Sequence, residues 1–138
     1  MLNETIQYRK GYKYQLARAY RVSIGIFPET SIRGPYISLT KTGKLTITKG
    51  YAWDGPSGPT IDTKNFMRGS LVHDVLYQLM RHDLLSQNRK DEIDCLLFNM
   101  CLEDGMSRIR AWWVYKGLQI GGRAATLASG QKRIHRAP

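Results

Sequence analysis

The hydrophobic residues change their spacing near residue 65, and this change limits the folds open to a chain of 138 residues. Before that point, apolar residues recur at every second position, as they do in a half-buried β-strand. After it, they recur every three to four residues, as they do on one face of an α-helix. Strands followed by helices are typical of an α+β fold with an antiparallel sheet.

The N-terminal part, residues 6–50, predicts antiparallel strands. Alternation is clearest in the run of four apolar residues Tyr20, Val22, Ile24 and Ile26. Residues 28–35 contain prolines, a glycine and a serine, and they predict a loop. A second alternating segment follows, with Thr42-Gly43 at its middle. That pattern predicts a β-hairpin.

Three helices are expected after the strands, at residues 65–82, 87–103 and 107–120. Ser86 is a suitable N-cap for the second helix, and Gly105 is a suitable stop after it. The short connection between the first two helices predicts that they lie antiparallel. The inward residues of the second helix should be Ile93, Leu96, Leu97, Met100 and Cys101.

We expect one α+β domain over residues 1–122 and a basic, low-complexity tail over residues 123–138. The composition of the tail is typical of a terminus that is disordered or ordered by a partner. No apolar run approaches the 18 residues of a membrane span, and the N-terminus lacks the apolar core of a signal peptide.

Cysteine and tryptophan allow further expectations. Cys95 and Cys101 fall in one predicted helix, about 9 Å apart along its axis, which is too far for a disulfide. We expect two buried thiols, as in a protein that matures in a reducing cytosol. For Trp112 and Trp113 we expect packing in the core, with anchoring at a membrane interface as the alternative.

The net charge of +10 is unevenly distributed. Residues 1–50 carry nine Lys/Arg and two Asp/Glu, residues 51–104 carry five and nine, and residues 105–138 carry seven and none. Basic flanks of this kind give solubility or attract a polyanion such as anionic lipid, nucleic acid or an acidic protein. No sequence motif for specific nucleic-acid recognition accompanies them, so any DNA contact should be non-specific.

Residues 51–77 carry the chemistry of this chain. The segment begins with a loop rich in Gly, Pro and Asp, whose backbone carbonyls and amides have no ladder partners. Such a loop can direct carbonyls at a hard cation or amides at an oxyanion. Asp54 and Asp62 add a carboxylate at each end. The loop leads directly into the helix expected over residues 65–82.

That helix contains a His-Asp pair. His73 and Tyr77 are four residues apart and share a face, and Asp74 lies about 100° round the helix. The antiparallel second helix would present Asp91 or Asp94 to the His73 ring. An isolated His-Asp pair is more often structural, but its position beside this loop favours a functional site. A zinc site is not expected, because no His or Cys residues are clustered.

The loop and the helix together resemble a family of small phage- and prophage-encoded proteins of unknown function. The matching segments are WDGPSGP at residues 53–59, LVHDVLY at residues 71–77, and then Arg89 and Asp94 in the second helix. The resemblance covers roughly residues 45–100. It implies a phage origin, with synthesis in the host cytoplasm and the virion as a further location.

The same residues are more remotely similar to phospholipase A2, in which a calcium loop precedes a helix with His-Asp-x-x-Tyr. The similarity implies that His73 is the general base and that Tyr77 and Asp94 orient it. It implies a calcium ion as cofactor, held by Asp74 and by the loop. The loop ligands that it implies are Trp53, Asp54, Gly55 and Gly58.

Three functions remain open from the sequence. The first is a calcium-dependent ester hydrolase acting on envelope lipid, with the basic flanks binding anionic lipid. The second is a non-catalytic virion or assembly component whose basic ends bind neighbouring subunits or DNA. The third is a host-directed effector that binds one host protein.

Overall fold

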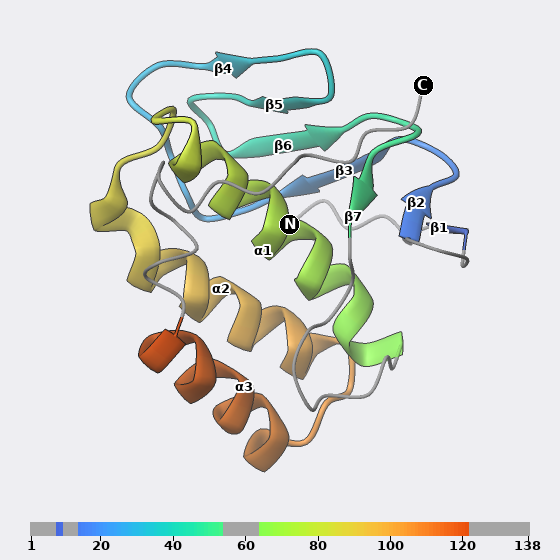
Figure 1. Ribbon diagram of the computed structural model, residues 1–138, viewed down its shortest axis with the longest axis vertical. Coiled ribbons are helices and arrows are strands. Elements are labelled where there is room, and N and C mark those ends of the chain that lie inside the picture. Colours follow the sequence, from blue (N-terminus) through green and yellow to red (C-terminus); the bar gives the residue numbers. More distant parts are fainter. Residues whose placement is uncertain (1–7, 10–13, 54–63, 122–138) are drawn as a thin grey trace. The chain divides into compact units, whose positions relative to one another are not determined.

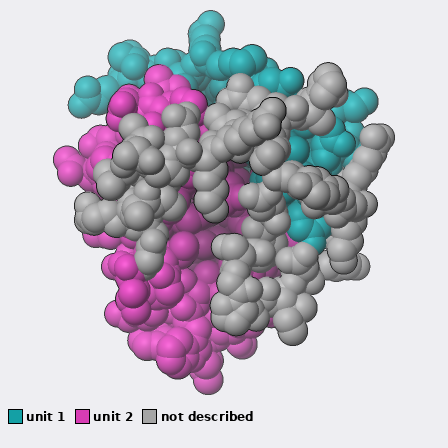
Figure 2. Space-filling model, viewed as in Figure 1, with its two compact units in different colours: residues 1–54, 133–138 teal, residues 55–132 magenta. Residues whose placement is uncertain are grey.

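In the computed structural model, the structure describes residues 8–9, 14–53 and 64–121. The chain divides into two compact units, coloured separately in Figure 2. We call the described residues up to 53 the strand unit and residues 64–121 the helix unit. The expectation of a single domain over residues 1–122 stays a prediction, and the tail at 123–138 lies outside the described residues.

The strand unit contains two antiparallel sheets (Figure 1). The first has three strands in the order β1 (Tyr8–Arg9), β2 (Tyr14–Leu16) and β7 (Ala52–Trp53). The second has four strands in the order β3 (Tyr20–Ser23), β6 (Lys44–Ile47), β5 (Ile37–Leu39) and β4 (Ile32–Arg33).

The alternating apolar residues account for the core of the four-stranded sheet. Val22 and Leu39 both pair with Leu45, and Ile37 pairs with Ile47, so apolar side chains of adjacent strands share one face. Leu39, Leu45 and Ile47 are fully buried. The predicted hairpin is confirmed: β5 and β6 are joined through Gly43, whose φ of +84° favours glycine.

The helix unit contains α1 (Lys64–Arg81), the short 3₁₀ helix η1 (Gln87–Arg89), α2 (Lys90–Glu103) and α3 (Arg108–Gly121). Helix α1 differs by one residue at each end from the predicted helix. The Ser86 side chain accepts a hydrogen bond from the Asn88 N–H, as expected of an N-cap. Gly105 follows α2 with a φ of +96°.

The α+β fold class is therefore confirmed, and so is the antiparallel helix pair. Helix α2 packs against α1 and runs in the opposite direction, and α3 packs against α2 (Figure 1). Gly69 of α1 allows this close approach, because a Cβ at that position would lie 2.6 Å from Cδ1 of Leu97 in α2. None of the helices that the structure describes has the length and apolar character that crossing a bilayer requires.

Helix α1 is buried on nearly every side. From Phe66 to Met80, Asp74 alone is only partly buried. Polar side chains are enclosed among the apolar ones, and enclosed polar groups require partners. Arg68, for example, forms ion pairs with Glu103 at 2.8 Å and Asp104 at 3.0 Å at the end of α2. The His-Asp-Tyr segment thus lies in the most enclosed helix of the unit.

Two sequence-based expectations were wrong. Trp112 and Trp113 do not pack in the core: their exposed fractions are 46% and 66%. The reason is the rotation of α3, which turns Ala111 into a cluster with Phe66 and the buried Cys101, and so turns the tryptophans outward. Only one thiol is buried, because Cys95 lies on the exposed side of α2.

This difference between the thiols predicts selective labelling. Burial raises the pKa of Cys101 to about 12, so its reactive thiolate is scarce as well as enclosed. Ellman's reagent should therefore modify one thiol in the native protein and both thiols in denaturant. A Cys95→Ser variant should show no rapid native reaction. Rapid modification of both thiols in the native wild-type protein would contradict the packing of α2.

Candidate functional site

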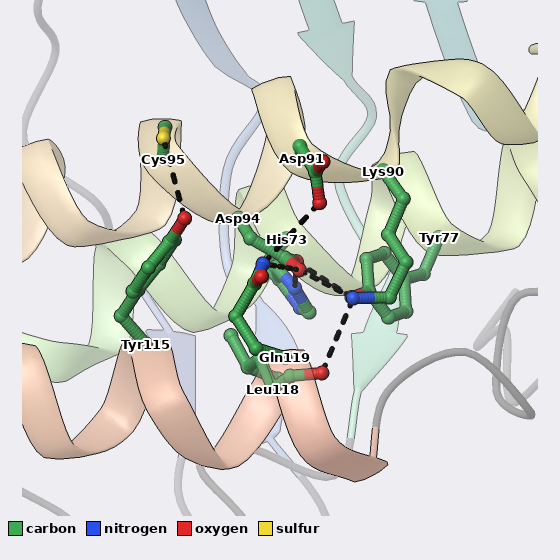
Figure 3. Close-up of polar contacts among 9 residues, drawn as sticks. All are labelled: His73, Tyr77, Lys90, Asp91, Asp94, Cys95, Tyr115, Leu118 and Gln119. Carbon is green, nitrogen blue, oxygen red and sulfur yellow. Dashed lines mark hydrogen bonds and ion pairs between the residues drawn. The ribbon is translucent and has the colours of Figure 1, made fainter.

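The carboxylate of Asp94 joins α2 to the His73–Tyr77 face of α1 (Figure 3). Its Oδ1 lies 3.0 Å from Nε2 of His73. The Tyr77 hydroxyl donates to the same oxygen at 2.6 Å. The one-turn spacing of His73 and Tyr77 places their rings together, with centroids 3.9 Å apart. Two side chains of α1 therefore contact the same carboxylate oxygen of Asp94 in α2.

The second oxygen of Asp94 is bound by side chains of α2 and α3. Nζ of Lys90 donates to Oδ2 at 2.7 Å and also to the backbone carbonyl of Leu118 at 3.2 Å. Nε2 of Gln119 donates to Oδ2 at 3.4 Å and to Oδ1 of Asp91 at 3.3 Å. Side chains from α1, α2 and α3 thus meet at one carboxylate (Figure 3).

Asp94 is completely buried, and His73, Tyr77 and Lys90 are nearly so. A charged carboxylate that is buried away from solvent is stable only when other groups donate hydrogen bonds to it. Burial acts to raise the pKa of Asp94, but hydrogen bonds from His73, Lys90 and Tyr77 outweigh it and lower that pKa. The carboxylate is therefore ionised at neutral pH.

The same burial sets the protonation of the two rings. Loss of water lowers the pKa of His73, and the Asp94 bond opposes this effect only in part. Burial, followed by the bond to Asp94, raises the pKa of Tyr77 above its ordinary value. At neutral pH the imidazole is thus uncharged and the phenol keeps its proton.

These protonation states identify the tautomer of His73. An ionised carboxylate only accepts hydrogen bonds, so Nε2 of His73 carries the hydrogen and Nδ1 carries the lone pair. Nδ1 forms no hydrogen bond with any residue in the described part of the chain. A neutral imidazole that is oriented by a carboxylate through one nitrogen can accept a proton at the other. The arrangement is chemically capable of general-base catalysis, and that role stays a prediction.

The structure describes only some of the calcium ligands that were expected from the sequence. Asp74 is a partly buried carboxylate of α1, next to His73 in the chain. Trp53 is buried at the end of β7 in the strand unit, against Tyr14. Asp54, Gly55 and Gly58 lie outside the described residues.

The donor chemistry of Asp74 is compatible with calcium. In the described part of the chain, no three His, Cys, Asp or Glu side chains form a group that suits a metal. A calcium ion also accepts backbone carbonyls, however, so one carboxylate with loop carbonyls is a sufficient type of donor set. The calcium expectation stays a prediction.

The structure also decides between the two acids that helix spacing left open, in favour of the one that the resemblance implied. Asp94 binds the His73 ring, whereas Asp91 is exposed and binds Gln119. Lys90 was missed, although its spacing of four residues from Asp94 on a predicted helix was a usable signal. Gln119 carried no such signal, because its contact depends on how α3 packs.

Comparison of the chain with protein-family models, with curated proteins and with solved structures finds no match.

Proposed function

We propose that this chain is a small phage-encoded ester hydrolase that resembles phospholipase A2, depends on calcium and acts on envelope lipid. The observation that supports the proposal is the hydrogen bond from His73 to the buried Asp94, with Tyr77 donating to the same carboxylate oxygen. This bond leaves the lone pair on Nδ1 of His73 for water. Phage origin, with the host cytoplasm or the virion as location, belongs to the same proposal.

In the proposed reaction, Nδ1 of His73 takes a proton from a water molecule as the water oxygen attacks the ester carbonyl carbon. The ring becomes an imidazolium, which the adjacent Asp94 carboxylate stabilises. Collapse of the tetrahedral intermediate breaks the bond to the alcohol, and the imidazolium returns the proton to the departing oxygen. A calcium ion near Asp74 would supply positive charge for the developing oxyanion.

Asp94 and Tyr77 act here as positioning residues. The Tyr77 hydroxyl and the Lys90 ammonium hold the two carboxylate oxygens. The carboxylate in turn holds the imidazole in one orientation and one tautomer. A base fixed in this way loses little entropy when the reaction occurs.

The proposal predicts that hydrolysis requires both calcium and Asp74. Wild-type protein with phospholipid vesicles should release fatty acid in calcium, and EGTA should abolish the release. Asp74→Asn should lower the activity at a fixed calcium concentration by about 10²-fold, because the substitution removes a charged ligand and its orienting bonds. Release can be followed by titration of the acid produced.

Asp83→Asn is the matched control, because Asp83 is an exposed acid just beyond α1 whose φ of +60° asparagine tolerates well. It should behave as wild type. Turnover that is equal in calcium and EGTA would refute a calcium-dependent mechanism.

A non-catalytic assembly component is the second candidate, and one observation favours it. Both oxygens of Asp94 are satisfied within a largely buried network that ties three helices together. Such a network also serves to fix helix packing. In that case the protein has no esterase activity, and it assembles through its basic ends with neighbouring subunits or DNA in a salt-dependent manner.

A further inference from the structure

Helix α3 exposes an apolar face. Of the six large hydrophobic side chains that are exposed among the described residues, four belong to this helix: Ile109 at 74%, Trp112 at 46%, Trp113 at 66% and Ile120 at 87%. Helices that pack at a protein surface usually direct polar residues to water. Helix α2 follows that rule, since its exposed residues are mostly acidic or polar. Helix α3 does not.

The exposed residues form one continuous surface. At 100° per residue, Trp112, Ile109, Ile120 and Trp113 follow one another over about 100° of the helix circumference. Lys116 lies within the same arc, with Nζ 5.6 Å from the centre of the Trp112 ring. The two indoles meet edge to face, with centroids 5.3 Å apart. We call these five residues the α3 face.

The charged side chains of α3 itself are all basic, and the exposed Asp91 of α2 lies beside the helix, bound to Gln119. Helix α3 contains Arg108, Arg110 and Lys116 and no acidic residue, and residues 105–138 as a whole contain seven Lys/Arg and no Asp/Glu. A second copy that docked through its own α3 face would bring like charges together. The basic C-terminal residues of the same chain would do the same. The complementary partner is therefore negatively charged.

We propose that the α3 face docks on an anionic lipid surface. Tryptophan side chains favour the boundary between lipid headgroups and acyl chains, isoleucines favour the acyl region, and Lys and Arg bind phosphate. With 14 residues, α3 is too short to span a bilayer, so it lies in the plane of the interface. This inference goes beyond the proposed function, because docking requires no turnover at His73.

Vesicle sedimentation with the full chain tests the docking. Wild-type protein should sediment with vesicles of phosphatidylcholine and phosphatidylglycerol, and less with vesicles of phosphatidylcholine alone. The double variant Trp112→Ser/Trp113→Ser should bind the anionic vesicles about tenfold more weakly or worse. Lys116→Gln should bind about fivefold more weakly in low salt.

Leu84→Ser is the matched control, because Leu84 is a 54% exposed apolar residue outside α3. This variant should bind as wild type does. Circular dichroism should show that the variants keep their helix content, as expected for exposed positions. His73→Gln should bind vesicles normally, so a loss of activity there is distinguishable from a loss of docking.

Two outcomes would overturn the proposal. One is equal sedimentation of the wild type and the double tryptophan variant with anionic vesicles. The other is a wild-type dimer that this double variant disrupts, together with no vesicle binding, because the α3 face would then be an interface between copies.

Discussion

A His73→Gln variant should lose calcium-dependent ester hydrolysis by about 10²–10⁴-fold while keeping its fold. Glutamine retains an N–H that can donate to Asp94, so the buried carboxylate keeps a partner at this position. It offers no basic nitrogen, so the attacking water keeps its proton. The rate of fatty-acid release on anionic vesicles and the urea unfolding midpoint measure the two effects separately.

His82→Gln is the control for this substitution. His82 is exposed and follows the last residue of α1, nine positions from His73. The same chemical change at this position should leave both activity and stability near wild type. If His73→Gln keeps full activity, the general-base role is wrong. A different result would favour the assembly function. In that case the wild type and both variants have no esterase activity, and His73→Gln unfolds because the hydrogen-bond network around Asp94 is structural.

Lys90→Met should lower the free energy of unfolding by about 3–5 kcal/mol, the usual cost of removing one partner of a buried ion pair. Methionine fills much of the same volume, so the loss comes mainly from Asp94, which keeps its charge without the 2.7 Å bond. The Leu118 carbonyl loses a donor as well. Urea unfolding followed by circular dichroism measures the change.

Arg89→Met is the matched control, because Arg89 immediately precedes Lys90 and also pairs with an acid of α2. Its bond to Glu92 is 3.3 Å long and more exposed, so the cost there should be within about 1 kcal/mol. The double variant Lys90→Met/Asp94→Asn should lose less than the sum of its single variants, because the buried charge is removed with its partner. Equal costs for Lys90→Met and Arg89→Met would show that the Lys90 pair contributes little.

Sequence patterns predicted the structure correctly where a residue influences only the backbone of its own segment. The alternation around Leu45 and Ile47 predicted strands, Gly43 predicted the hairpin, and Ser86 predicted the start of the second helical segment. Each depends on φ/ψ preferences or on neighbours one turn away. The helix bounds consequently agreed closely with the structure.

Signals failed where the answer depends on the rotation of a helix about its own axis. The exposure of Cys95 and of both α3 tryptophans follows from which stripe of each helix packs inward. In α3, the periodic pattern contains apolar residues on almost every side, so periodicity alone does not identify the buried stripe. Ala111, the smallest of them, is buried in the core cluster, and Val114 and Leu118 pack against the same cluster.

The sequence by itself determined the order of strands and helices, the shared face of His73 and Tyr77, and the pair of acids able to reach it. Helix spacing left Asp91 and Asp94 open, and the resemblance implied Asp94. The tertiary structure shows the bond from His73 to Asp94, adds Lys90 and Gln119 to it, and exposes the α3 face. The physical reason is the difference in sequence separation between the interacting residues. Backbone preferences and one-turn spacings act within a segment, whereas a buried carboxylate collects donors from whichever helices meet around it.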